Sequence, residues 1–234
     1  MKAFIIAGGE GTRLRPYTYT LPKPMLPVGG KPIIHYVLEH LKSSGVKEVV
    51  LAVGYLHEKI SDYFSDGQKF GMKITYAVEK EALGTAGSIL ASKEHPKEPF
   101  FVVMGDAIMD LDLKALADAH KKSGAIATVA LLKYKTKIPY GVANVNNGFI
   151  VQFQEKPELE NYINIGIYVL SPEIFNFIKE KEDFAKDVFP RLLSKGKKIA
   201  AFKVEKGVWV DIGRLEEYEK LKDGKEIARM LGKI

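Results

Sequence analysis

The chain of 234 residues contains no cysteine. This absence excludes disulfide bonds, zinc sites built from thiolates and catalysis by a cysteine nucleophile. A chain of this length can bury enough apolar surface to fold without disulfides or a structural metal. The lack of cysteine also suits a cytoplasmic protein, which is the location we expect.

The chain also lacks an apolar segment long enough to cross a membrane. The amino terminus leads directly into the apolar residues 3–7, with only Lys2 ahead of them. This run is too short for a signal peptide or a membrane span, so we expect a buried first strand and no membrane partner. Linkers rich in Pro, Gly or Ser, internal repeats and low-complexity stretches are absent as well. We therefore expect one domain over residues 1–234.

The charge balance is moderately basic, with a formal net charge of +6. Excess positive charge can serve nucleic acid, an anionic membrane surface or a polyphosphate substrate. Most basic residues alternate with Glu along predicted helices, as in residues 216–220, which is typical of a solvated helix face. No basic block is interleaved with aromatic residues, so we expect no nucleic-acid partner.

Strand patterns alternate with helical patterns in the first half of the chain. We predict strands at 2–7, 49–53, 72–78 and 100–104, and helices at 32–43, 57–64, 85–93 and 113–122. Such alternation is typical of an α/β fold with a doubly wound, mostly parallel sheet and helices on both faces.

The pattern changes in the second half, where an added hairpin region is expected. We predict strands at 125–132 and 165–170, a hairpin formed by 141–145 and 149–154, and a helical tail from Leu215. Ser171 is the expected cap of a further helix, because Pro172 and Glu173 after it suit a first helical turn.

Glycine is concentrated in the turn after the first strand. Residues 7–14 have the sequence AGGEGTRL, and three glycines in four positions let main-chain N–H groups approach an anion closely. Arg13 adds a planar guanidinium suited to phosphate oxygens. A tight turn without a ligand is the alternative. Neither familiar phosphate loop fits, because the dinucleotide fingerprint needs glycine at Leu14 and no Gly-Lys pair precedes Ser or Thr.

A second cation follows in a proline-rich segment. Residues 21–28 have the sequence LPKPMLPV, and the three prolines stiffen the backbone around Lys23. A lysine held near the glycine turn would suit a triphosphate that loses pyrophosphate. A rigid surface loop is the alternative interpretation.

Together these two segments resemble the signature of the sugar-1-phosphate nucleotidyltransferases, which make nucleotide sugars such as GDP-mannose, dTDP-glucose and UDP-glucose. The resemblance continues in order along nearly the whole chain, at residues 83–87 (LGTAG), 105–106 (GD), 140–141 (YG), 155–157 (EKP), 164–168 (NIGIY) and 209–213 (WVDIG). It implies a Rossmann-like nucleotidyltransferase fold, a magnesium requirement, and a nucleoside triphosphate and a sugar 1-phosphate as substrates.

The resemblance also implies a role for each matching residue. The catalytic residues would be Arg13, Lys23, Asp106 and Asp211, and the two acids would bind Mg²⁺. The nucleotide would contact Ala7, Gly8, Gly9, Gly11, Thr12, Arg13, Glu79, Leu83 and Gly84. The sugar 1-phosphate would contact Tyr140, Gly141, Glu155, Lys156 and Asn164, with Lys156 on its phosphate. Asp106 also follows a predicted buried strand, where open α/β sheets bind their ligands.

Two positions depart from the family pattern. Ala82 stands where the family commonly has Pro, and Ala107 where it has a polar or branched residue. Both lie near the expected nucleotide or metal. The sequence therefore predicts the type of reaction more firmly than the base of the nucleotide. Overall similarity around residues 83–87 slightly favours guanylyl transfer from GTP to mannose 1-phosphate or a related sugar. Thymidylyl or uridylyl transfer from dTTP or UTP to glucose 1-phosphate is the alternative.

Asp110 and Asp112 offer a different function. An Asp-x-Asp after a strand resembles the metal motif of glycosyltransferases, which consume a nucleotide sugar and release a nucleoside diphosphate. The favoured interpretation is that both acids open the helix predicted at 113–122, where negative charge is stabilising.

The third possibility is a regulatory protein that binds nucleotide sugars without catalysing a reaction. Such a protein would be expected to lose Arg13, Lys23 or the two metal acids, and this chain has them all. Only the helical tail follows Asp211, so we expect no carboxy-terminal β-helix domain. The oligomeric state stays open.

Overall fold

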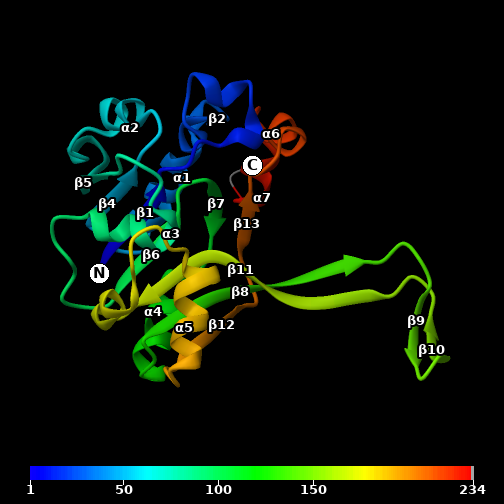
Figure 1. Ribbon diagram of the computed structural model, residues 1–234. Coiled ribbons are helices and arrows are strands. Elements are labelled where there is room, and N and C mark those ends of the chain that lie inside the picture. Colours follow the sequence, from blue (N-terminus) through cyan, green and yellow to red (C-terminus); the bar gives the residue numbers. More distant parts are fainter. Residues whose placement is uncertain (233–234) are drawn as a thin grey trace.

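The computed structural model describes residues 1–232 and centres on a seven-stranded sheet of order β12-β8-β11-β6-β1-β4-β5 (Figure 1). Its strands are β1 (Lys2–Ala7), β4 (Glu48–Val53), β5 (Lys73–Val78), β6 (Phe100–Met104), β8 (Ala127–Lys137), β11 (Glu158–Leu170) and β12 (Ile199–Val204). β1 pairs in parallel with β4 and β6, β4 with β5, and β12 with β8, whereas β11 runs antiparallel to both of its neighbours. The predicted mostly parallel α/β sheet is confirmed.

Alternation along the strands gives the sheet two buried faces. In β1, Ala3, Ile5 and Ala7 point into one apolar cluster, and Phe4 points into the other. The first cluster packs against α1 (Ile33–Ser43), α2 (His57–Phe64) and α4 (Leu113–Ser123). The second packs against α3 (Gly84–Gly87), α5 (Phe189–Ser194) and the 3₁₀ and π turns beside them. Helices therefore cover both faces, as a doubly wound sheet requires.

The remaining elements are short. They are the strands β2 (Pro27–Val28), β3 (Lys31–Pro32), β7 (Ala107–Asp110) and β13 (Val208–Asp211), and the 3₁₀ helices η1 (Thr12–Leu14), η2 (Tyr17–Tyr19), η3 (Lys23–Met25), η4 (Gln68–Phe70), η5 (Ser88–Ala91) and η6 (Pro172–Phe177). A π-helical turn, η7, spans Phe184–Val188. The tail forms α6 (Leu215–Leu221) and α7 (Lys225–Met230), as predicted, and its last two residues lie outside the described part.

Two helix predictions are wrong in detail. The segment predicted as a helix at 85–93 is one α-helical turn, α3, followed by η5, and it ends at Ala91. Two glycines weaken this helix, and the Ser88 hydroxyl bonds back to the Gly84 carbonyl at 2.6 Å. Ser171 precedes a 3₁₀ helix and caps nothing with its side chain, because its hydroxyl is hydrogen-bonded to His120 at 3.0 Å.

A long two-stranded arm leaves the body of the molecule. β8 and β11 are longer than the predicted strands at 125–132 and 165–170, and they continue outward as a ribbon (Figure 1). Their outer halves are charged and exposed, so apolar patterning did not reveal them. Ion pairs such as Lys133 with Glu160 at 2.6 Å link the two strands. The predicted hairpin, β9 (Val142–Asn146) and β10 (Phe149–Gln154), forms at the far end of this arm.

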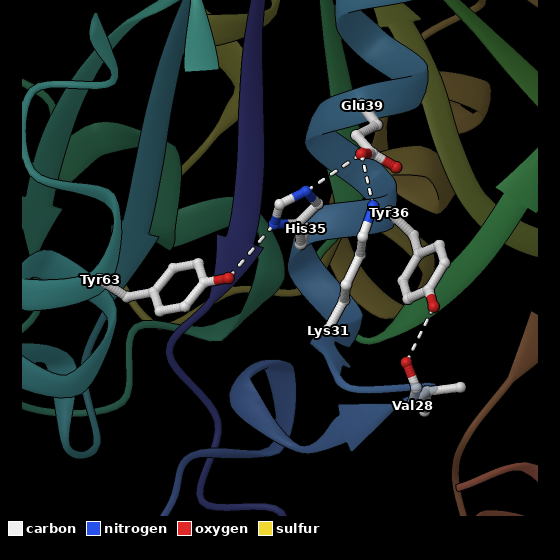
Figure 2. A network of polar contacts seen from close by, with 6 residues as sticks. All are labelled: Val28, Lys31, His35, Tyr36, Glu39 and Tyr63. Atoms are coloured by element: carbon white, nitrogen blue, oxygen red, sulfur yellow. Dashed lines mark hydrogen bonds and ion pairs between the residues drawn. The ribbon is translucent and has the colours of Figure 1, made fainter. Parts of the chain in front are cut away.

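The start of α1 is tied to its surroundings by a polar network (Figure 2). The Tyr36 hydroxyl donates to the Val28 carbonyl at 2.8 Å, which joins α1 to β2. Glu39 accepts hydrogen bonds from Lys31 at 2.9 Å and from His35 at 3.1 Å. Burial acts to raise the pKa of Glu39, but the hydrogen bond and charge of Lys31 and the contact with His35 outweigh it and lower this pKa. No helix among residues 1–232 is long and apolar enough to cross a membrane.

The buried imidazole of His120 links α4, β8 and the segment after β11 by hydrogen bonds. Its Nδ1 is 2.9 Å from the Thr128 hydroxyl, and its Nε2 is 3.0 Å from the Ser171 hydroxyl. Burial lowers the pKa of His120, because the imidazolium loses hydration there. At a pH below the unfolded value of about 6.5, the unfolded chain binds more protons, so protonation favours unfolding.

We expect the free energy of unfolding to fall as the pH is lowered from 7.5 to about 5.5. His120→Gln should reduce this pH-dependent loss, although it also lowers stability at pH 7.5. His57→Gln, at a partly exposed position, is the matched control and should keep the wild-type pH dependence. Urea unfolding midpoints at the two pH values measure the effect, and an unchanged loss in His120→Gln would contradict this role.

Candidate active site

The candidate site lies at the carboxyl ends of β1 and β6. These strands are parallel neighbours, but the chain passes from β1 to β4 on one side and reaches β6 on the other. Such a point of reversal leaves a crevice outside the strand ends, where ligands bind in open α/β sheets. The glycine turn follows β1, and Asp106 follows β6.

A first cavity of about 310 Å³ opens at this point. Six of the residues predicted to bind nucleotide line it, together with two predicted catalytic residues on the adjoining segments: Ala7, Gly8, Gly9, Gly11, Thr12 and Arg13, with Lys23 and Asp106. The Arg13 side chain forms no hydrogen bond or ion pair with another residue of the described chain. Its guanidinium is therefore available to an anionic ligand.

Gly11 is required by the backbone and by its neighbours. Its φ of 63° is left-handed, and a Cβ placed there would lie 2.9 Å from Cβ of Lys23 and 3.0 Å from Cγ2 of Thr18. The Thr18 hydroxyl donates to the Gly11 carbonyl at 2.9 Å. The turn thus packs directly on the segment that holds Lys23. Gly9 differs, since nothing lies within 4 Å of a Cβ built there.

Lys23 is a buried cation between two carboxylates. Its side chain is only 9% exposed, and its Nζ lies 2.6 Å from Asp106 Oδ2 and 3.6 Å from Asp211 Oδ1. It occupies the first position of η3 between Pro22 and Pro24, whose fixed φ angles suit this short turn. The proline-rich segment therefore positions Lys23 in the site and does not form a solvated surface loop.

A β ribbon that was not predicted brings the two acids together. β13 pairs antiparallel with β7, and Asp211 stands opposite Ala107, the residue after Asp106. Ala107 is buried with 6% exposure, so the small side chain allows this close pairing. Asp211 is the last residue of its strand.

The two acids suit a hard cation without enclosing it. Both carboxylates reach the same ammonium group, so they converge on one point. In the described part of the chain no group of three or more His, Cys, Asp or Glu side chains could hold a metal. Mg²⁺ commonly takes one or two carboxylates and completes its shell with water and substrate phosphates, so these residues fit that ion.

A second cavity of about 410 Å³ adjoins the first. Five residues line both cavities: Arg13, Lys23, Thr85, Met104 and Asp106. The second cavity is also lined by Asn164, Asp183, Lys186, Trp209 and Asp211. Two ligands bound in these cavities would meet at the shared cations and acid.

Among the predicted sugar-phosphate residues, Asn164 lies in the second cavity. It stands at a register shift of β11, where its Nδ2 donates to the Tyr168 hydroxyl at 2.9 Å and its Oδ1 accepts from the Gly166 N–H at 2.9 Å. Gly166 has a φ of 73°, and a Cβ there would come within 2.5 Å of Met104 Cγ. This bulge turns Asn164 toward the cavity.

The other four predicted sugar-phosphate residues lie on the arm. Tyr140 and Gly141 precede β9, and Glu155 and Lys156 follow β10 (Figure 1). They line neither cavity. The side chains of Glu155 and Lys156 are each 68% exposed and lie 3.9 Å apart. In this conformation of the arm, the structure does not bring them together with Lys23 and the acids.

The predicted base-facing residues lie behind the glycine turn. Glu79 is adjacent to Gly8, since a Cβ built on Gly8 would lie 3.0 Å from Glu79 Oε1. Its Oε2 accepts the Leu83 N–H at 3.3 Å, and its buried Oε1 has no hydrogen-bond partner among the described residues. Glu79, Leu83 and Gly84 do not line the first cavity, but Thr85 does.

Asp110 and Asp112 point away from the site. Asp110 ends β7, and its carboxylate lies 3.7 Å from Nδ1 of His40. Asp112 caps α4, where its Oδ1 accepts the Ala115 N–H at 2.8 Å. Neither lines the two cavities. The helix-cap interpretation is therefore confirmed for Asp112, whereas Asp110 belongs to a strand.

Several residues of the second cavity were not predicted from the sequence. Thr85, Tyr168 and Trp209 belong to motifs of the family signature, but no role was assigned to them. Lys186 lies in the π-helical turn η7 and Asp183 directly precedes it, outside every motif that we recognised. No local signal identifies them, because tertiary contacts of η7, such as that of Phe184 with Tyr168 of β11, bring them to the site.

Residues 2–226 match the family model described as Nucleotidyl transferase. The chain belongs to this family. A UTP–glucose-1-phosphate uridylyltransferase of Synechocystis is 39% identical over 93% of this chain, and a mannose-1-phosphate guanyltransferase of Yarrowia lipolytica is also 39% identical over 93%. The chain spans only 61% and 62% of the lengths of these two relatives.

A solved structure supports the same fold. The crystal structure of a Bacillus anthracis protein described as a glucose-1-phosphate thymidylyltransferase, in complex with a sucrose, superimposes with a TM-score of 0.76. It is 28% identical, and the match covers 98% of this chain and 95% of that chain. The predicted nucleotidyltransferase fold and family are confirmed.

Gly11→Ala tests the packing of the glycine turn on Lys23. We expect the free energy of unfolding to fall by about 1–2 kcal/mol, because an L-residue is strained at this φ and its Cβ would lie 2.9 Å from Cβ of Lys23. Gly9→Ala is the matched control and should unfold like the wild type. Denaturant unfolding measures both variants. Equal stability of Gly11→Ala and Gly9→Ala would contradict the contact with Lys23.

Proposed function

We propose that this protein transfers a nucleoside monophosphate from a nucleoside triphosphate to a sugar 1-phosphate and releases pyrophosphate. The single observation that supports this most strongly is the pair of adjoining cavities that share Arg13, Lys23 and Asp106. One cavity holds the glycine turn suited to a triphosphate, and the other holds polar groups suited to a sugar phosphate. Relatives of this chain are named for such transfers to glucose 1-phosphate and mannose 1-phosphate.

The reaction would be an in-line attack by a sugar-phosphate oxygen on the α-phosphorus, with pyrophosphate as the leaving group. The attacking oxygen is already anionic at neutral pH, so no general base is required. The obstacle is the repulsion between two polyanions. Arg13 and Lys23 would reduce that repulsion from the shared wall of the cavities, and the main-chain N–H groups of the glycine turn would orient the triphosphate.

Asp106 and Asp211 would hold a magnesium ion. When bound, Mg²⁺ supplies positive charge that neutralises phosphate oxygens as charge develops on them. The half-exposed carboxylates leave room for water and phosphate oxygens beside the ion, which fits its preference. The Pro22–Pro24 region keeps Lys23 beside both acids, so the cationic side chain and the metal acids form one unit.

The base of the triphosphate is proposed to be guanine, with mannose 1-phosphate or a related sugar as acceptor. A carboxylate such as that of Glu79 only accepts hydrogen bonds. Guanine presents two adjacent donors on its Watson–Crick edge, whereas uracil and thymine present one donor between two carbonyl oxygens. The buried Oε1 of Glu79 lacks a partner in the described chain and would suit the guanine edge. Transfer from dTTP or UTP to glucose 1-phosphate is the second candidate, favoured by the uridylyltransferase relative.

A grid of GTP, dTTP, UTP and ATP with mannose 1-phosphate and glucose 1-phosphate tests the reaction by pyrophosphate release. We expect release that depends on both substrates and on Mg²⁺. Asp106→Asn and Asp211→Asn should each lower turnover by at least about 100-fold at saturating magnesium. Asp110→Asn is the matched control and should keep turnover, since Asp110 lies outside both cavities.

Two outcomes would contradict this assignment. Wild-type turnover in Asp106→Asn or Asp211→Asn would remove the two acids from the reaction. Release of a nucleoside diphosphate from a nucleotide sugar, lost in Asp110→Asn, would instead support the glycosyltransferase alternative.

Glu79→Gln tests the choice of base. An amide both donates and accepts, so kcat/KM should fall about tenfold or more for GTP and fall less, or rise, for UTP and dTTP. The ratio of kcat/KM values between the nucleotides is the measurement. An equal change for all nucleotides would mean that Glu79 supports the fold and does not select the base.

A further inference from the structure

We propose that Lys186 binds the phosphate group of the sugar 1-phosphate at the second cavity, and that Asp183 positions Thr85 beside it. This inference rests on the proposed function and adds two residues to its acceptor site.

The second cavity needs a cation for an incoming phosphate. Its basic lining residues are Arg13, Lys23 and Lys186. Lys23 is buried and is held by Asp106 and Asp211, and Arg13 also lines the triphosphate cavity. Lys156 lies on the arm and lines neither cavity. Lys186 is thus the cation that belongs to the second cavity alone.

The π-helical turn η7 holds Lys186 in place by its buried neighbours. Phe184 and Val188 are fully buried in the second apolar cluster, which fixes the backbone on both sides of Lys186. The Lys186 side chain itself is 82% exposed, and its Nζ lies 3.5 Å from Asp183 Oδ2. Such an exposed pair is weak, so the ammonium can turn to a phosphate at little cost. π-helical turns occur frequently at functional sites.

Asp183 connects η7 to the nucleotide side of the site. Its Oδ1 accepts hydrogen bonds from both the N–H and the hydroxyl of Thr85, each at 3.0 Å. The Phe184 N–H donates to the same Thr85 hydroxyl at 3.0 Å. These bonds from Thr85 outweigh the effect of burial and hold the pKa of Asp183 below its usual value. Asp183 therefore stays a carboxylate, and Thr85 lines both cavities.

A polar ligand would also satisfy a donor in the wall of this cavity. The indole Nε1–H of Trp209 is buried and has no hydrogen-bond partner in the described chain. Trp209 lines the second cavity with Asn164 and Asp183. A cavity lined by an unpaired buried donor, a carboxylate and an amide is one that a sugar with several hydroxyl groups would fit.

The test is steady-state kinetics of pyrophosphate release with mannose 1-phosphate and GTP. If the substrate grid gives higher activity with glucose 1-phosphate and UTP, that pair is used instead. Lys186→Met keeps the aliphatic stem and removes the charge. It should raise KM for the sugar 1-phosphate by at least about tenfold and leave KM for the nucleotide within about twofold, because a charge-assisted hydrogen bond is lost from one substrate only. Lys186→Arg should recover part of that loss.

Two further variants separate positioning and general charge from direct contact. Asp183→Asn should raise KM for both substrates, because Thr85 would lose its anchor between the cavities. Lys121→Met, at an exposed position of α4, is the matched control for removing one positive charge and should match the wild type. Equal urea unfolding midpoints for Lys186→Met and Lys121→Met would exclude a folding defect.

The outcomes distinguish this inference from the proposed function. Pyrophosphate release by the wild type with an unchanged KM in Lys186→Met would overturn the inference alone, and a loss confined to Lys156→Met would do so as well. A change of the nucleotide KM in Lys186→Met as large as that for the sugar 1-phosphate would also overturn it. Absence of pyrophosphate release by the wild type with every substrate pair would overturn the proposed function and the inference together.

Discussion

The candidate site depends on one buried cation and the two carboxylates around it. An ammonium group as buried as that of Lys23 is costly unless it is paired, so its position requires both Asp106 and Asp211. The three residues come from the proline-rich turn, the end of β6 and the end of β13. If any one of these segments moved, a charge would lose its partner. The same contact therefore joins distant parts of the chain and assembles the shared wall of the two cavities.

The tail helices pack behind this contact and support it. A third apolar cluster joins the glycine turn, β2, β7 and the tail helices through Leu14, Val28, Ile108, Tyr218 and Ile227. The Tyr218 hydroxyl donates to the Pro27 carbonyl at 3.0 Å, next to the segment that carries Lys23. The tail helices α6 and α7 thus support the backbone that presents the buried lysine. Their role in the site is structural support, since the tail lines neither cavity.

Local sequence patterns predicted the hairpin of the arm but not the direction of the ribbon that carries it. The turn Asn146-Asn147-Gly148 predicted its hairpin, and the hairpin forms there. Exposed apolar side chains such as Phe149 and Phe153 occur on it, so alternation of apolar residues does not reveal which strand faces are buried. The family resemblance implies that Glu155 and Lys156 contact the sugar 1-phosphate, and this remains a prediction. Whether they meet the cavity depends on the direction of the β8–β11 ribbon, which no local sequence encodes.

The sequence by itself determined the strands and helices of the first half, the glycine turn and the family, because these follow from local periodicity, glycine backbone freedom and ordered motifs. Most of the wall of the first cavity was therefore predictable, from Ala7 to Arg13. Only the tertiary structure decided the rest. Pairing of β7 with β13 brings Asp211 to Asp106, and the packing of η7 brings Asp183 and Lys186 to the second cavity. The physical reason is that these approaches join residues about 100 positions apart, where the free energy comes from shared burial and hydrogen bonds and not from any local pattern.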